Sequence, residues 1–187
     1  MNGTELLSQY RAGTRNFSSI NLIREKLNGV DLCQANFSQA ILTEVDFSEA
    51  NLAQTSFYLA LLNLSNLTEA IFTAANLKSA NLRSALLYKA DCSKAQLQKV
   101  NLQRAILKRA FLREANLSGA NLIDADLSQA NLIDADLSGA DLTGANLDTT
   151  FFLGANLTGA NLTGVNLERA ILTNAIMPNG RVYSRVK

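Results

Sequence analysis

The side chains that could do chemistry in this sequence are two cysteines and a few closely spaced acids. Cys33 and Cys92 are the two thiols, and the chain has no His. Nucleophilic catalysis by a Ser-His-Asp or Cys-His arrangement is therefore impossible, and two thiols are too few for a Cys-only zinc site. Asp-Ala-Asp segments at 124–126 and 134–136 offer too few converging oxygens for Ca²⁺. We expect no catalytic residue, no metal site and no cofactor.

A five-residue repeat positions every one of these side chains. Starting at Phe17, a Leu or Phe recurs at about 33 consecutive positions up to Met177, and Cys92 and Met177 are the exceptions. Two residues before each of these central residues lies a second column, mostly Ala. The residue before the centre is usually Asn or Asp, and the two after it are small or polar. The thiol of Cys92 is thus expected in the core, and that of Cys33 outside.

A period of five fits neither a regular helix nor a straight strand. On a helix, five residues advance about 500°, so successive central residues drift by roughly 140° and form no face. On a strand, side chains alternate, so an odd period sends them to opposite faces. The chain must instead turn once per repeat. A short extended segment points both the Ala and the Leu inward, and the small residues that follow form a corner.

Segments such as Ala140-Asp141-Leu142-Thr143-Gly144 resemble the pentapeptide-repeat family, and the likeness covers residues 16 to 177. The resemblance implies an all-β fold, a right-handed quadrilateral β-helix (β-solenoid) with four repeats per coil. About eight coils would follow, roughly 38 Å long at about 4.8 Å per layer. Phe17, Phe37 and Phe57 are twenty residues apart, so they should stack on one face.

The two ends need caps, because a solenoid leaves open β edges. Residues 1–15 are expected to form a helical cap, N-capped by Thr4 and stopped near Gly13, which docks through Leu6, Leu7 and Tyr10. Residues 16–177 form the β-helix, and residues 178–187 a C-terminal turn and tail or strand. Glu25 occupies an inward position where Ala is expected, so the sequence leaves open whether the first coil is regular.

Charge is banded along the chain, with a basic middle between two acidic stretches. A candidate basic belt for an acidic partner comprises Lys78, Arg83, Lys89, Lys99, Lys108, Arg109 and Arg113. The alternative is internal pairing, because residues twenty apart are neighbours on adjacent coils. It predicts the pairs Glu69–Lys89, Lys94–Glu114 and Arg104–Asp124.

Apolar residues also occupy outward positions on the face whose central residues include Leu112, Leu132 and Phe152. A candidate apolar patch for partner binding comprises Phe111, Ile133, Phe151, Leu153 and Ile171. The alternative is that these side chains fold over the coil edge and are half buried.

The sequence favours a non-enzymatic protein-interaction or scaffold module over an enzyme, because a filled tube leaves no cavity for a small-molecule substrate. Its partner would be another protein or a second copy in a dimer. The resemblance offers an alternative, a DNA-mimic binder of gyrase, although a net charge of +1 departs from the acidic surface that mimicry requires. Binding of an acidic partner such as nucleic acid through the belt also stays open. We expect no membrane span and a cytoplasmic location, since the first twenty residues lack a signal-peptide pattern.

Overall fold

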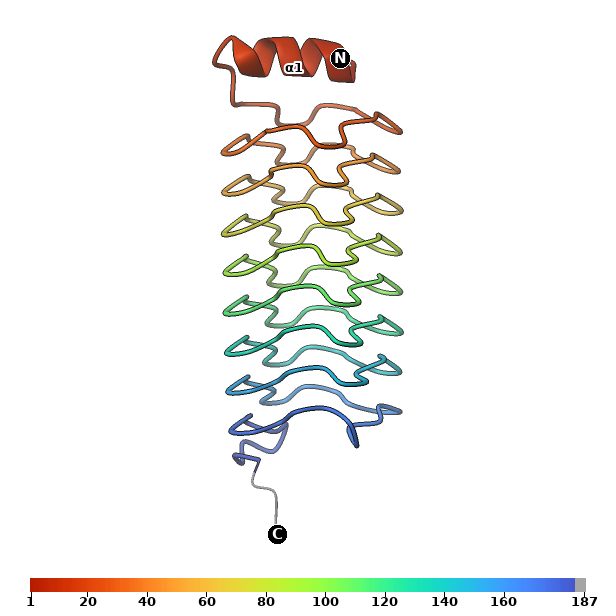
Figure 1. Cartoon of the computed structure of the whole chain (residues 1–187), viewed down its shortest axis with the longest axis vertical. Coiled ribbons are helices and arrows are strands. Elements are labelled where there is room, and N and C mark those ends of the chain that lie inside the picture. The colour runs from red at the N-terminus through yellow and green to blue at the C-terminus, as the bar shows by residue number, and fades with distance from the viewer. Residues whose placement is uncertain (184–187) are drawn as a thin grey trace.

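The computed structural model describes residues 1–183 and consists of a helix, α1 (Gly3–Arg11), on top of a four-sided β-solenoid (Figure 1). Parallel β-bridges join residues twenty apart, from Asn16↔Asn36 at the start to Asn156↔Ile176 at the end. Residues 16 to 176 thus span eight steps of twenty, in agreement with the predicted number of coils. A turn recurs every five residues, so a coil of twenty residues has four sides.

The interior is filled by the two predicted columns of side chains, the central residues and the mostly Ala residues two positions before them. Every central residue from Phe17 to Leu157 is at most 2% exposed. Phe17, Phe37 and Phe57 stack as expected, with centroid separations of 5.6 and 5.4 Å. Burial raises the pKa of the Cys92 thiol to about 12, so this thiol stays protonated and unreactive.

Corners are built by the polar residues around each centre. The side chain before the centre accepts a hydrogen bond from the backbone two residues later; Asn116 Oδ1, for example, accepts one from Ser118 N at 3.0 Å. The second residue after the centre has a positive φ, as in a type II turn. Gly119 adopts it with φ 65°, but so does Glu114 with φ 56°. Asn and Asp therefore recur because each closes its own turn.

The N-terminal end is closed by α1, whose capping differs from the prediction. Asn2, and not Thr4, is the N-cap, because Asn2 and Glu5 form a reciprocal capping box. Leu6 is fully buried against the first coil, and Leu7 and Tyr10 pack beside it as predicted. The Tyr10 hydroxyl also donates to the Cys33 carbonyl oxygen at 2.8 Å.

Glu25 has a role that the repeat pattern does not reveal. Its carboxylate accepts a hydrogen bond from Gly3 N, in the first turn of α1, at 3.0 Å. The ladder passes through this repeat undisturbed, since Asp46 N donates to the Glu25 carbonyl oxygen at 2.9 Å. The regularity of the first coil, which the sequence left open, is thus kept: the Glu25 carboxylate bonds to the helix and the backbone stays in register.

At the C-terminal end the last coil is open. Leu127 N donates to Asn146 O one coil later, but Leu147 N has no backbone acceptor within residues 1–183. A cleft of about 260 Å³, lined by Leu147, Asn166 and Arg169 among others, lies where the coils separate. The chain then turns at Pro178 and returns, with an antiparallel bridge between Ile176 and Val182. The predicted tail falls partly on residues 184–187, outside the described part.

Candidate interaction surfaces

The predicted apolar patch lies on one face of the solenoid. Parallel bridges place Phe111, Asn131, Phe151 and Ile171 in this order on successive coils. Phe111 is 49% exposed and Phe151 40%, while Leu153 and Ile171 are exposed to a similar degree. Ile133 is half-buried. Most of the patch is thus available to a partner.

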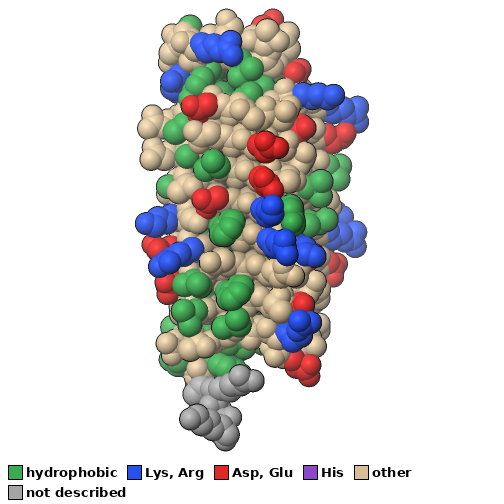
Figure 2. Space-filling model, in the orientation of Figure 1, with side chains coloured by type: hydrophobic (Ala, Val, Ile, Leu, Met, Phe, Trp, Pro, Cys, Tyr) green, Lys and Arg blue, Asp and Glu red, His purple; other side chains and the backbone are tan. Residues whose placement is uncertain are grey.

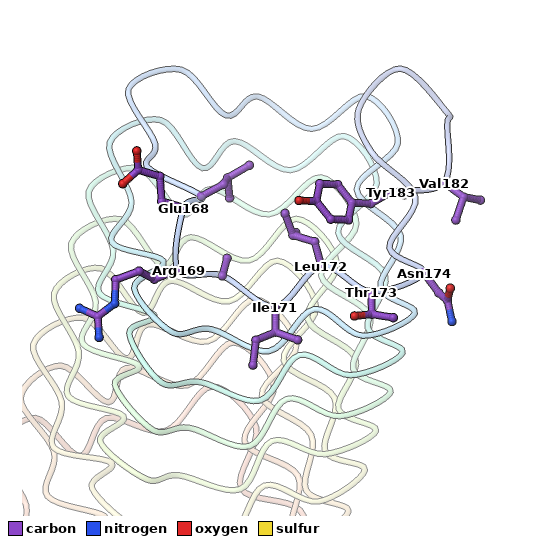
Figure 3. Close-up of a pocket in the computed structure, with 10 residues that line it drawn as sticks. Glu168, Arg169, Ile171, Leu172, Thr173, Asn174, Val182 and Tyr183 are labelled. Atoms are coloured by element: carbon purple, nitrogen blue, oxygen red, sulfur yellow. The ribbon is translucent and has the colours of Figure 1, made fainter. Parts of the chain in front are cut away.

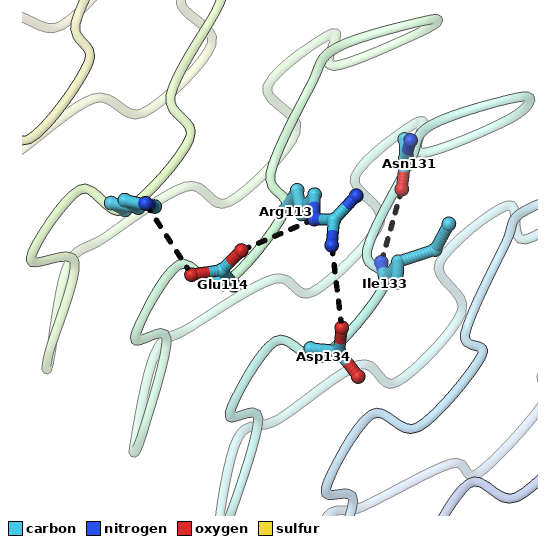
Figure 4. Close-up of polar contacts among 6 residues, drawn as sticks. Arg113, Glu114, Asn131, Ile133 and Asp134 are labelled. Carbon is cyan, nitrogen blue, oxygen red and sulfur yellow. Dashed lines mark hydrogen bonds and ion pairs between the residues drawn. The ribbon is translucent and has the colours of Figure 1, made fainter.

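Within this patch the structure forms a groove that the sequence did not predict. It has a volume of about 600 Å³, and its lining comprises Lys89, Arg109, Phe111, Gln129, Asn131, Ile133, Thr149 and Phe151. The two phenylalanines stand two coils apart, and Asn131 lies between them. The Asn131 side chain is turned toward its own corner, where its Oδ1 accepts a hydrogen bond from Ile133 N at 3.1 Å (Figure 4).

The basic belt is partly neutralised by acids on adjacent coils. The three predicted pairs are present, at 2.9 Å for Lys89–Glu69 and 3.7 Å for both Lys94–Glu114 and Arg104–Asp124. Arg113 contacts Glu114 at 3.2 Å and Asp134 at 4.0 Å (Figure 4).

The remaining belt residues have no ion-pair partner within residues 1–183: Lys78, Arg83, Lys99, Lys108 and Arg109. They are spread over three faces: Lys78 and Lys99 share one, Lys108 and Arg109 share another, and Arg83 lies on a third. Figure 2 shows basic side chains interspersed with acidic and hydrophobic ones on the visible face. No face of the belt therefore carries more than two of these five cations.

A second exposed apolar cluster lies on the coil before the belt and was missed by the sequence reasoning. It comprises Tyr58, Leu59, Leu61 and Leu64, and Leu64 is 55% exposed. Leu59 and Leu64 also hold the positive φ of the turn position, at 57° and 61°. Leu residues at outward turn positions, which elsewhere hold Gly, Ala or polar residues, were the signal that could have found it.

A further cavity of about 610 Å³ opens at the C-terminal end (Figure 3). Figure 3 shows Leu172 and Tyr183 toward its middle, while Glu168 and Arg169 point to the outside. Arg169 pairs there with Asp148 at 3.2 Å. The lining mixes apolar side chains such as Ile171 and Leu172 with polar ones such as Thr173 and Asn174.

The acids considered for metal binding are used in other ways. Asp124 pairs with Arg104, and Asp126 accepts hydrogen bonds from Ser128 N at 2.9 Å and from Asn146 Nδ2 at 3.0 Å. No cluster of three or more metal-ligating side chains occurs in the described chain. Among residues 1–183, no helix has the length and apolar character needed to cross a membrane.

Comparisons with known proteins agree with this architecture. The sequence matches the model of pentapeptide repeats in eight copies, over residues 16–57, 65–104, 95–132, 110–148 and 135–174. The crystal structure of HetL, a pentapeptide repeat protein involved in heterocyst differentiation regulation in the cyanobacterium Nostoc sp. strain PCC 7120, is similar with 32% identity and a TM-score of 0.75. That match covers 98% of this chain and 100% of HetL.

QnrB1, a plasmid-mediated fluoroquinolone resistance protein, shares the fold at 18% identity and a TM-score of 0.52, over 90% of this chain and 84% of QnrB1. No curated protein sequence matches the chain. The solved structures confirm the predicted fold class, a right-handed quadrilateral β-helix with a short helix at its N-terminus.

Proposed function

This chain belongs to the pentapeptide-repeat family, and we propose from this that it is a non-enzymatic module that binds another protein through the apolar patch. The observation that carries the proposal is the exposure of Phe111 and Phe151 beside a groove on an otherwise regular face. Large exposed apolar side chains gathered in one place are typical of protein interfaces. HetL, similar over its whole length, is involved in regulation, which supports a regulatory role for this interaction.

A protein partner explains the surface better than nucleic acid does. Nucleic-acid binding rests on several cations that contact phosphates together, whereas each face of the solenoid carries at most two of the belt residues without an ion-pair partner in the described chain. Mimicry of DNA in gyrase binding requires a broadly acidic surface, and this chain has a net charge of +1. The likeness to QnrB1 is one of fold.

Because Cys33 and Cys92 are both unpaired, we propose that this interaction takes place in a reducing compartment such as the cytoplasm.

The proposal is tested by affinity purification from cells that make the protein, with Phe151→Glu as the test variant. Ile106→Glu is the matched control, because Ile106 is also 40% exposed and also precedes a central residue, but lies on another face. A charge placed in the patch should abolish capture of specific partners, because the carboxylate would be desolvated in the interface. The control should keep them.

Light scattering after gel filtration shows whether the partner of the patch is a second copy of this chain or another protein. If the wild-type protein is a dimer and Phe151→Glu a monomer, the patch serves self-association. If both are monomers and partner capture is equally strong for wild type and Phe151→Glu, the patch is not the interface and the proposal fails.

A further inference from the structure

The groove in the apolar patch contains a slot of defined width. Phe111 and Phe151 occupy alternate coils of one ladder, so their attachment points are separated by about two layers, roughly 10 Å. Phenyl rings on adjacent coils, such as Phe17 and Phe37, lie 5.6 Å apart and touch. Because Asn131 is shorter and is held toward its own turn, the space between the two exposed rings is left for one apolar side chain at van der Waals distance.

One edge of the slot carries a cation that is fixed in place but not neutralised. The Arg109 guanidinium donates from Nε to Gln129 Oε1 at 2.7 Å and from Nη1 to the Tyr88 hydroxyl at 3.5 Å. No acid lies within 4.0 Å of Arg109 in the described chain, although Arg24, Arg104 and Arg113 all have acidic partners. The Arg109 charge is therefore not neutralised by an acid of residues 1–183, and Nη2, which has no hydrogen-bond partner among them, can bind a carboxylate of a partner.

The slot and the cation together specify the chemistry of the occupant. We propose that the groove binds an extended peptide segment of another protein, with one apolar side chain between Phe111 and Phe151 and a nearby Asp or Glu on Arg109. This proposal rests on the proposed function and names the partner of the same patch. The polar side chains of Asn131, Gln129 and Thr149 line the same groove, where they can hydrogen-bond to the peptide backbone.

A second copy of this chain fits the groove less well. In a two-fold symmetric dimer the same patch would face itself, so Arg109 would need an acid from the same face. The acids beside this patch already have partners within the chain. Glu114 and Asp134 contact Arg113, and Asp91, next to Phe111 on the ladder, accepts hydrogen bonds from Ser93 N and the Thr73 hydroxyl. A separate acidic and apolar segment therefore gives better charge complementarity than self-association.

The test uses fluorescein-labelled synthetic peptides that carry one Leu and one Glu separated by no, one or two Thr residues in an otherwise Ser and Thr sequence. Fluorescence anisotropy with the full chain is expected to give a Kd below about 1 mM for at least one spacing. Phe151→Ala and Arg109→Gln should each weaken that binding by about tenfold. The matched control Ile106→Ala should leave it unchanged.

A charge swap makes the test specific for the ion pair. Replacing Glu by Lys in the peptide should abolish binding to the wild type, and Arg109→Glu should restore it for the Lys peptide. Circular dichroism melting checks that each variant stays folded. If no peptide binds below about 1 mM, or if Arg109→Gln binds as well as the wild type, the inference is overturned. The proposed function survives that result when Phe151→Glu still loses its cellular partner, and it fails when the partner is kept.

Discussion

The two ends of the solenoid differ in how their central residues are covered. At the N-terminal end, α1 closes the tube, and Phe17, Leu22 and Leu27 in the first coil are each 1% exposed. At the C-terminal end no helix lies over the described chain, and Leu162 and Leu167 hold the same repeat position but are half-buried. Leu172 in the same last coil is only 4% exposed, beside the returning segment in which Tyr183 N donates to Ala175 O. The exposure of a central residue thus depends on whether another segment lies over its part of the coil.

The difference shows that the repeat builds the tube but does not finish it. Each coil buries its central residues against its neighbours, so a terminal coil has half of its contacts missing unless another element supplies them. At the N-terminal end the sequence supplies Leu6 and Glu25 for this purpose. At the C-terminal end the ladder loosens, as the unpaired Leu147 N shows within residues 1–183.

The strongest test of this contrast removes one apolar side chain at each end. Leu6→Ala should lower the free energy of unfolding by about 2–4 kcal/mol, because Leu6 is fully buried between α1 and the first coil. Leu167→Ala should cost less than about 1 kcal/mol, since part of that side chain already contacts water. Urea denaturation followed by circular dichroism measures both. Equal losses would show that the two ends are covered equally well.

Hydrogen exchange tests the open ladder at one pair of positions. Leu127 and Leu147 occupy the same repeat position on the same face, one coil apart, and both are buried. Leu127 N donates to Asn146 O at 2.9 Å, whereas Leu147 N has no backbone acceptor in the described chain. We expect the Leu147 amide to exchange at least about tenfold faster in an NMR experiment, which corresponds to about 1.4 kcal/mol of local stability. Similar rates would mean that the last coil closes in solution.

The interior was predictable from the sequence, and the ends and the groove were predictable only in part. The period of five fixes which side chains point inward. The coil of four repeats that the family resemblance implies then places Phe17, Phe37 and Phe57 in one stack. The role of Glu25 depends on where the helix docks, which no repeat specifies. The members of the apolar patch were found as exceptions to the repeat, but the slot over Asn131 depends on how that side chain turns, and Arg109 was counted among the belt.

A smaller effect is expected when Glu25, which links α1 to the first coil, is replaced by Ala, the residue that the repeat prefers at this position. Glu25→Ala should lower the free energy of unfolding by about 1 kcal/mol, although Ala is the usual residue at inward positions, because Gly3 N loses its acceptor. Urea denaturation measures the change. Glu49→Ala is the control, since Glu49 is an exposed acid with no side-chain partner in the described residues, and it should have almost no effect. A more stable Glu25→Ala variant would show that the helix does not need this contact.

The smallest expected effect is a pH-dependent one, from a pair that ties the first coil to the second. Arg24 Nε and Nη2 donate to the Glu44 carboxylate at 2.7 and 3.1 Å. The hydrogen bond from Arg24 lowers the pKa of Glu44. The folded-state pKa therefore lies below the unfolded value of about 4.3. The stability that this pair contributes is present above that pH and is lost as the pH falls through the folded-state pKa.

The comparison with Glu44→Gln isolates this contribution. The wild type should have a slightly higher urea midpoint than the variant at neutral pH, and the difference should disappear in strong acid, where Glu44 is protonated. Both side chains are solvent-exposed, so salt should also reduce the difference. A difference between wild type and Glu44→Gln that persists unchanged in strong acid would show that the ion pair is not its source.

The Arg169–Asp148 contact offers the matching case at the open end. The backbone hydrogen bond of the neighbouring Leu147 N is missing there within residues 1–183. Asp148→Asn is therefore expected to loosen the last coil locally without moving the urea midpoint of the whole solenoid.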